Sequence, residues 1–230
     1  VIAIPLSIGS AIFISEIATP KVKAIMKPAI ELLAGIPSVV YGFFGLLVLT
    51  TWIQGTFNVP TGETWLAGSI LLGIMAIPTI TSVAEDAISS VPREYKEGSL
   101  AVGATRWQTI SKVVVPSAMS GITAGFILGI GRAIGETMAV MMVCGNPTYG
   151  LIPSPITNIF APVKTLTATL GIEMGEVATG SNHYYALFGL ALILLIITLV
   201  VNILATVILG RLKERQKSGS KKKPFISYEI

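Results

Sequence analysis

Five long apolar segments are the feature that most constrains how this chain can fold. They lie at residues 1–15, 32–53, 65–84, 117–144 and 184–210. A helix that crosses a bilayer needs about 20 mostly apolar residues, and each segment meets this length at least in part. A soluble chain of 230 residues, 52% of them hydrophobic and 12% charged, could not cover five such helices with polar layers. We therefore expect an all-α, polytopic transmembrane helical bundle with five spans.

The first segment begins at Val1 within an apolar run, without a methionine and without a charged leader. We see no signal peptide in it. We expect a truncated helix there, and six spans in the parent chain.

Basic residues predict how the spans are oriented. Residues 21–27, 93–112 and 211–223 together hold 14 of the 16 Lys and Arg residues. Short cytoplasmic loops attract Lys and Arg, so all three segments are expected inside. Five crossings then place the N-terminus outside and the C-terminus inside, in a multi-pass protein of the cytoplasmic (inner) membrane. We expect a permease domain over residues 1–210 and a basic cytoplasmic tail over residues 211–230.

The net charge of +4 follows from this topology and calls for no nucleic-acid partner. The run Lys221-Lys222-Lys223 could contact anionic membrane lipid, although a flexible tail that sets the topology is the favoured interpretation. Cys144 is the only cysteine and His183 the only histidine, so we expect no metal site. The chain also lacks a P-loop that could hold ATP phosphates. We therefore expect no catalytic residue and no cofactor on this chain.

Glycine and proline residues predict where helices bend and pack. Gly35-Ile36-Pro37 stands near the start of the second span, and it is compatible with a simple kink or with a break along a transport path. Residues 19–28 are expected to form a short connector at the membrane surface. Gly121, Gly125 and Gly129 share one face of the fourth span, where small residues let another helix approach closely.

Two further regions flank the spans. Residues 145–183 are expected outside, with a partly helical stretch around 160–178. Glu85 and Asp86 are expected to form a solvated end of the third span, although either could instead orient the loop that follows.

Arg132 and Glu136 are charged residues inside the fourth span. Arg132 lies about fifteen residues, or roughly 22 Å, from the start of that span, which is past the middle of the hydrocarbon core. The two residues are four apart and share a helix face, so we expect that they can pair.

Two interpretations of these charges compete. In the first, the ion pair pins neighbouring helices and touches nothing that is transported. In the second, Arg132 faces a wet pathway and offers its charge to an anion, while Glu136 holds its geometry. Ionisable residues inside a membrane are functional by default, which favours the second interpretation. The planar guanidinium suits oxyanions, because it donates two parallel hydrogen bonds.

The charged loop, residues 85–116, joins the third and fourth spans. Gly103 follows Glu97 by six residues, and the run Val113–Pro116 begins ten residues after that glycine. This spacing resembles the cytoplasmic loop of ABC-importer permeases, whose short coupling helices sit in a groove of the ATPase subunit. The resemblance implies that Glu97, Gly103 and Pro116 belong to the ATPase coupling site. The chain departs from the family at Gly98-Ser99, where two alanines are usual, and we expect a locally weaker helix.

Two membrane segments narrow the resemblance. Leu33–Gly42 and Gly131–Val140, with Gly145-Asn146, resemble phosphate-importer permeases, and their PstC-type subunit rather than the PstA-type partner. The resemblance implies the MetI-like permease fold and a subunit that translocates inorganic phosphate. Arg132 and Glu136 carry over as charged positions of the substrate pathway.

The same resemblance implies the partners: a second permease of the PstA type, two ATPase subunits that bind ATP and Mg, and an extracytoplasmic phosphate-binding protein. Two alternatives stay open. The chain could be a permease for another oxyanion, such as molybdate or sulfate, or a membrane scaffold or channel whose charged loop binds another cytoplasmic partner.

Overall fold

The computed structural model describes residues 2–148 and 157–221. Within these ranges it is helical, and the only strand-like feature is an isolated bridge between Gly145 and Val163. In chain order the helices (α) and π-helical segments (η) are α1 (Ala3–Ile12), η1 (Phe13–Ile17), α2 (Pro20–Gly35), α3 (Ser38–Phe44), η2 (Gly45–Leu49), α4 (Thr50–Phe57), α5 (Trp65–Ser89), α6 (Arg93–Ala101), α7 (Arg106–Thr109), η3 (Ile110–Val114), α8 (Val115–Gly135), α9 (Met138–Val143), α10 (Leu166–Glu173) and α11 (Asn182–Lys221).

Four helices of the described residues are long and apolar enough to cross a membrane. They are Ser38–Phe57, Trp65–Ser89, Arg106–Gly135 and Asn182–Leu212, where adjoining α and π segments form one continuous helix. By length and composition they match four of the five predicted spans. The first, Ala3–Ile17, is apolar but shorter than a spanning helix needs to be.

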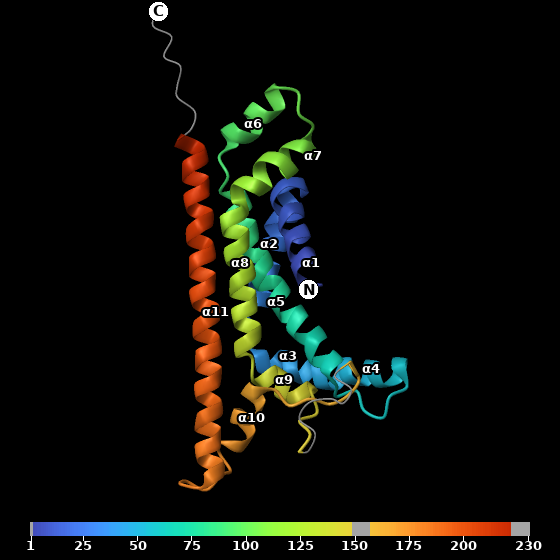
Figure 1. The fold of residues 1–230 in the computed structure, drawn as a ribbon. Helices are drawn as coiled ribbons and strands as arrows, with labels where there is room; N and C mark the ends of the chain where they lie inside the picture. Colours follow the sequence, from blue (N-terminus) through green and yellow to red (C-terminus); the bar gives the residue numbers. More distant parts are fainter. Residues whose placement is uncertain (1, 149–156, 222–230) are drawn as a thin grey trace, which may run out of the picture.

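α5 and α8 form the centre of the bundle and run antiparallel (Figure 1). Their close approach depends on the predicted glycine face. A Cβ atom at Gly121 would lie 2.3 Å from the Cβ of Ala87, and one at Gly129 would lie 2.5 Å from Cγ1 of Ile80. At Gly125 the nearest neighbour would be the carbonyl oxygen of Ile80, at 3.2 Å. The prediction of a close helix contact at this face is confirmed, and the partner is α5.

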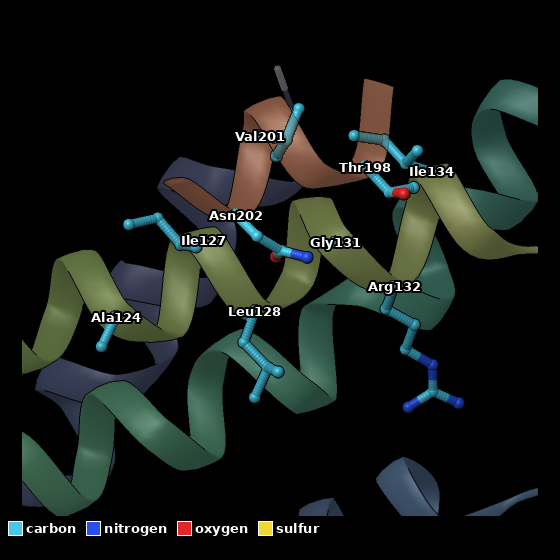
Figure 2. A pocket seen from close by; sticks show the side chains of 9 residues that line it. All are labelled: Ala124, Ile127, Leu128, Gly131, Arg132, Ile134, Thr198, Val201 and Asn202. Atoms are coloured by element: carbon cyan, nitrogen blue, oxygen red, sulfur yellow. The ribbon is translucent and has the colours of Figure 1, made fainter. Parts of the chain in front are cut away.

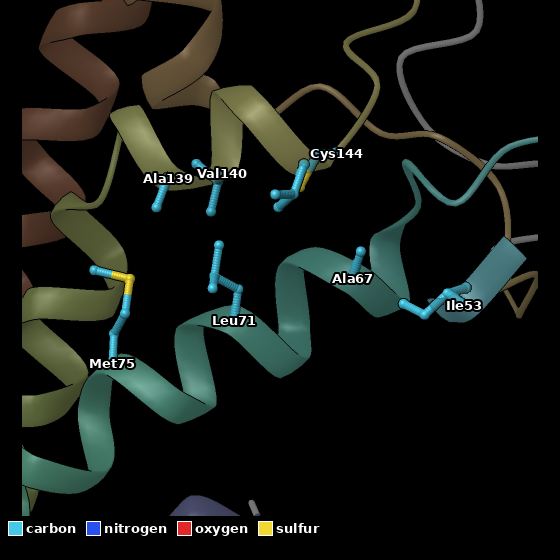
Figure 3. Close-up of a cluster of buried hydrophobic side chains, with 8 residues drawn as sticks. Ile53, Ala67, Leu71, Met75, Ala139, Val140 and Cys144 are labelled. Atoms are coloured by element: carbon cyan, nitrogen blue, oxygen red, sulfur yellow. The ribbon is translucent and has the colours of Figure 1, made fainter. Parts of the chain in front are cut away.

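Two hydrophobic clusters stabilise the two ends of this bundle. The cluster beside the charged loop joins α1, α5 and α8, and its buried members are Ala11, Ala84, Ile88, Val91, Val114, Ala118 and Ile122. The other cluster joins the first half of α5 to α4 and α9 (Figure 3), and its buried members are Ile53, Ala67, Leu71, Met75, Ala139, Val140, Val143 and Cys144.

α3, α4 and α9 run across the direction of α8 and α11, at the end of the bundle opposite the charged loop (Figure 1). α9 is a separate helix, because the chain becomes extended at Glu136. The fourth span therefore ends at Gly135, and the prediction that it continues to residue 144 is wrong.

α2 contains most of the segment 19–28 that was expected to be a short connector; the segment is not short, since it forms part of a helix of 16 residues, and its place at the membrane surface stays a prediction. Pro20 stands at the start of the helix, where its missing N–H is tolerated, and the helix continues through Pro28 to Gly35. The chain is then extended at Ile36, and α3 begins at Ser38. The break at Gly35-Ile36-Pro37 is thus a full interruption, and the second span begins at Ser38 rather than at residue 32.

α11 runs along the outside of α8, and its C-terminal part reaches the same end of the molecule as α6 and α7 (Figure 1). It confirms the span predicted over 184–210 and continues to Lys221. The remainder of the predicted tail, residues 222–230, lies outside the described residues. The side of the membrane on which this end lies stays a prediction.

Candidate functional site

The charged loop folds into two short helices, α6 and α7, that project from one end of the bundle (Figure 1). Gly103 ends α6 in the left-handed conformation, with φ of +88°. The N–H of Gly103 bonds to the carbonyl of Leu100, and the N–H of Ala104 bonds to that of Ser99. Glycine is the residue that adopts this helix-ending turn without strain. The spacing of Gly103 in the loop therefore has a conformational cause.

The other two predicted coupling residues lie on either side of this turn. Glu97 is exposed on α6, and Pro116 is exposed in the first turn of α8. Ser99 does not interrupt α6, which is continuous from Arg93 to Ala101. Its Oγ lies 3.0 Å from Oγ1 of Thr109, so the departure from the family pattern supplies a hydrogen bond between α6 and α7.

Four large side chains of the loop are exposed although they are apolar or aromatic. Tyr95 is 52% exposed, Leu100 44%, Val102 85% and Trp107 65%. These residues lie outside the helices that are buried in the bundle. A projecting loop with exposed apolar side chains is typical of a surface that contacts another protein.

The loop is fixed to the bundle by an ion pair. The Nζ of Lys96, on α6, lies 2.5 Å from Oε1 of Glu16, in η1. A movement of α6 would therefore act on η1, which directly precedes α2.

Arg132 lies half-buried in the last turn of α8. Its Nη1 donates to the carbonyl oxygen of Ala34 (3.2 Å) and to Oγ1 of Thr79 (3.0 Å). One residue earlier, the carbonyl of Leu33 accepts a hydrogen bond of 2.9 Å from the hydroxyl of Tyr41. Arg132 and Tyr41 thus satisfy carbonyls at the C-terminal end of α2, as an interruption at membrane depth requires. The guanidinium also meets the negative end of that helix dipole.

Arg132 keeps donors for a further ligand. The guanidinium carries five N–H donors, and the described residues bond to Nη1 alone. Nε and Nη2 form an edge that fits two oxygens of one oxyanion. Figure 2 shows the side chain directed away from Thr198 and Asn202 of α11, toward the opposite side of α8.

Glu136 forms no ion pair with Arg132 in the described part of the chain, so the predicted pairing is wrong. Its Oε1 accepts a hydrogen bond of 3.1 Å from the N–H of Ala139, and its carbonyl accepts one of 2.8 Å from Oγ1 of Thr167. The reason is the end of α8: once the chain becomes extended at Glu136, the two residues no longer share a helix face. Glu136 instead caps α9 and joins it to α10.

Sequence reasoning missed the buried carboxylate of Glu85. Oε1 lies 2.7 Å from the Nζ of Lys23, and Oε2 lies 2.8 Å from the Nζ of Lys27. Lys27 also lies 2.6 Å from Oδ1 of Asp86, and the hydroxyl of Ser89 donates to Oε1 of Glu85 at 2.6 Å. We call these five residues the ionic cluster. Hydrogen bonds to Asp86 and Glu85 raise the pKa of Lys27 above its ordinary value.

The expectation of a solvated helix end is wrong for Glu85, whose side chain is 3% exposed, while the Asp86 side chain is 61% exposed. The available signal was the spacing of Lys23 and Lys27, which places both on one face of a helix. This spacing is informative only if the segment is a helix, and the sequence predicted a connector there.

At the opposite end of the molecule, Glu173 of α10 contacts two basic side chains. It forms an ion pair with Lys164, and its Oε2 lies 2.8 Å from Nε2 of His183, near the start of α11. The hydrogen bond from Lys164, followed by that from His183, holds the pKa of Glu173 below its ordinary value. α10 confirms the helical stretch expected within residues 160–178. Among the described residues no group of side chains is arranged to hold a metal ion.

A groove of about 460 Å³ lies between α8 and α11, which are in contact elsewhere along their length (Figure 2). It is lined by Ala124, Ile127, Leu128, Gly131, Arg132, Ile134, Thr198, Val201 and Asn202. A Cβ atom at Gly131 would have no neighbour within 4 Å. This face of α8 is therefore loosely covered.

Comparison with known proteins finds matches that cover nearly the whole chain. Residues 3–217 match the model of the family described as binding-protein-dependent transport system inner membrane component. A probable ABC transporter permease protein, YqgH of Bacillus subtilis, is 45% identical over 92% of this chain and 67% of its own length. The phosphate transport system permease protein PstC of Mesorhizobium japonicum is 37% identical over 93% of this chain and 69% of its own length. PstC of Haemophilus influenzae is 34% identical, with coverage of 93% and 71%.

Two solved structures share the fold. The MetNI methionine ABC transporter in an inward-facing conformation aligns with a TM-score of 0.67 and 17% identity, over 91% of this chain and 87% of that one. An amino acid ABC transporter with histidines aligns with a TM-score of 0.54 and 18% identity, over 91% and 86%. At these identities the likeness supports the MetI-like permease fold.

Proposed function

Because the chain belongs to the family of binding-protein-dependent transport system inner membrane components, we propose that it is a permease subunit of an ATP-driven importer of inorganic phosphate. The observation that carries this proposal is the similarity to PstC permeases over more than nine-tenths of the chain. The subunit itself does no covalent chemistry. It provides one part of an anion pathway through the cytoplasmic membrane.

Arg132 is the proposed contact for the anion. Its Nε–Nη2 edge, which bonds to none of the described residues, can donate two parallel hydrogen bonds to a phosphate oxyanion, while Nη1 stays bonded to Ala34 and Thr79. A guanidinium inside a membrane helix is costly, which supports a functional reason for its presence. Glu136 acts on this site indirectly, because it fixes the end of α8 by capping α9.

The charged loop is the proposed docking element for a separate ATPase subunit in the cytoplasm. Glu97 and the exposed side chains of Tyr95, Leu100, Val102 and Trp107 would contact the ATPase. Gly103 and Pro116 would set the shape of the loop. The complete importer would comprise this chain, a PstA-type permease, two ATPase subunits that bind ATP and Mg, and an extracytoplasmic phosphate-binding protein.

The test is uptake of labelled phosphate by the complete complex in proteoliposomes, with wild type, Arg132→Ala and Arg132→Lys. We expect Arg132→Ala to assemble normally and to lose uptake by at least tenfold. Arg132→Lys keeps the charge and a donor for the Ala34 carbonyl but lacks the planar fork, so we expect an intermediate rate. Loss of assembly in both variants would identify Arg132 as a structural pin. Unchanged uptake would place the substrate contacts elsewhere.

The same assay tests the cargo. Wild-type uptake of sulfate or molybdate in place of phosphate would identify a permease for another oxyanion. Absence of uptake for all three anions would favour a scaffold or channel. Glu97→Lys tests the loop separately: we expect loss of ATPase capture in a pull-down, and unchanged capture would contradict the docking assignment.

A further inference from the structure

α2 is held in position by polar contacts at its two ends rather than by burial. None of its residues is buried. In its first half, Lys23 and Lys27 contact the carboxylate of Glu85. At its last turn, the carbonyl of Ala34 accepts a hydrogen bond from Arg132. The two ends are eleven residues apart, or about 16 Å along the helix.

The ionic cluster lies where the charged loop begins, directly before α6. Only residues 90–92 separate the end of α5 from the start of α6. The hydroxyl of Ser89, which bonds to Glu85, also lies 3.1 Å from the hydroxyl of Ser15 in η1. The neighbouring residue of η1, Glu16, binds Lys96 of α6. α5, η1 and α2 therefore meet at one point beside the loop.

α8 provides the second connection between the loop and Arg132. α7, η3 and α8 form one continuous helix, Arg106–Gly135, so a displacement of α7 would reach Arg132 along the helix itself. The hydrogen bond between Arg132 and Ala34 therefore joins α8 to α2, and both helices are linked to the loop at their other ends.

We propose that Glu85 is a positioning residue for transport: by holding Lys23 and Lys27, it makes α2 move with the end of α5 and so sets the position of the Ala34 carbonyl against Arg132. This role rests on the proposed function, in which an ATPase moves the charged loop and Arg132 faces the anion. When α2 and α8 shift relative to each other, the Ala34 carbonyl, bonded to Nη1, turns the guanidinium and so changes the direction in which the Nε–Nη2 edge faces the anion.

Burial distinguishes Glu85 from its neighbour. Both Glu85 and Asp86 contact Lys27, but the Glu85 side chain is 3% exposed and also binds Lys23 and Ser89. The Asp86 side chain is 61% exposed and in the ion pairs of the described residues has one partner. Water can replace the contact of Asp86, whereas it cannot reach Glu85 without displacing α2.

The experiment measures movement of α2 directly in the complete importer. Spin labels are placed at Leu32 on α2 and Leu128 on α8, both exposed, after replacement of Cys144, the only native cysteine, by alanine. The distance between the labels is measured with and without ATP. We expect an ATP-dependent change in the wild-type background.

Glu85→Gln keeps the size of the side chain and removes its charge, and Asp86→Asn is the matched control. We expect Glu85→Gln to lose at least half of the ATP-dependent distance change, and the phosphate imported per ATP hydrolysed to fall at least fivefold. Asp86→Asn should retain both. A lower yield of assembled complex with an unchanged distance change and ratio would show that Glu85 is merely structural, and would overturn the proposal.

Three further outcomes remain. If Glu85→Gln does not assemble, the double variant Lys23→Gln/Lys27→Gln takes its place, because it removes both ion pairs that join α2 to Glu85; an unchanged distance response there overturns the proposal. If the wild-type importer carries no phosphate, the proposed cargo fails while the distance change still tests the positioning role. A wild-type complex with no ATP-dependent change between α2 and α8 would refute that role.

Discussion

The two faces of α8 are packed very differently. Toward α5 the helix presents Gly121, Gly125 and Gly129, and the two backbones are so close that an added methyl group would meet atoms at 2.3–3.2 Å. Toward α11 it presents Gly131, beside a groove of about 460 Å³ (Figure 2). In the most apolar part of each span, 39% of the residues are buried in α5 and 6% in α11.

The difference teaches which contacts the chain makes within itself and which surfaces it leaves to its surroundings. α1, α2, α5 and α8 share buried clusters, a glycine face and the ionic cluster, so they form one body with the charged loop. α11 offers aliphatic side chains to its surroundings, as a helix in contact with hydrocarbon does. Glycine therefore has a different role on each face of α8, and substitutions should reveal this.

The largest effect on stability is expected for Glu85, the buried carboxylate of α5. Glu85→Ala removes the buried carboxylate that Lys23, Lys27 and Ser89 contact; because the side chains of Lys23 and Lys27 are 35% and 36% exposed and can be hydrated, we expect a cost of about 2–3 kcal/mol, below that of a fully buried pair. Asp86→Ala removes an exposed partner of Lys27, which should cost about 0–1 kcal/mol. Thermal unfolding of the two variants in detergent checks the difference. Equal melting temperatures would mean that the ionic cluster is solvated, and that the α5 side is less tightly closed than its geometry indicates.

The next effect compares the two glycine faces directly. Gly121→Ala brings a methyl group against the Cβ of Ala87, which cannot move without its backbone, and overpacking of this kind costs about 1–3 kcal/mol. Gly131→Ala meets no atom within 4 Å and should gain up to about 1 kcal/mol from helix propensity. The measurement is again the melting temperature of each variant. A destabilised Gly131→Ala would show that the α11 face is covered more closely than the groove indicates.

The sequence predicted the features that depend on local composition. Long apolar runs located the spans, the four-residue spacing of Gly121, Gly125 and Gly129 located the close contact, and Gly35-Ile36-Pro37 located the break. Each of these signals acts within a few residues of its own position. The residues of the segment itself are enough to cause each feature, and for this reason the predictions hold.

The failures depend on contacts that are distant in the chain. Residues 117–144 contain no proline that would mark the end of a helix. α8 nevertheless ends at Gly135, because Glu136 caps α9 and bonds to Thr167. α2 contains two prolines and three lysines, and it is stabilised as a helix against α5 by Glu85, about sixty residues away. The predicted pairing of Arg132 with Glu136 assumed an uninterrupted helix, and it is wrong because α8 ends at Gly135.

The smallest effect on stability is expected for the polar contact between Glu173 and the start of α11. Glu173 binds Lys164 and His183, and its pKa lies below the ordinary value of 4.5. A carboxyl group with a lowered pKa in the folded state contributes stability that is fully present above its ordinary pKa and is lost as the pH falls through the folded value. Glu173→Gln should therefore melt lower than wild type at pH 7, by the equivalent of up to about 1 kcal/mol. The two proteins should converge as the pH falls below 4.5 toward 3.

Glu176→Gln is the control for this titration, because Glu176 is exposed near the same helix and has no ion pair among the described residues. We expect it to follow wild type at every pH. A constant offset between Glu173→Gln and wild type down to pH 3 would contradict the assignment, since it would arise from packing rather than from charge. Convergence would instead show that the start of α11 is held by a weak, titratable contact, in contrast to the α5 side of α8, where the glycine face is closely packed and the carboxylate of Glu85 is buried.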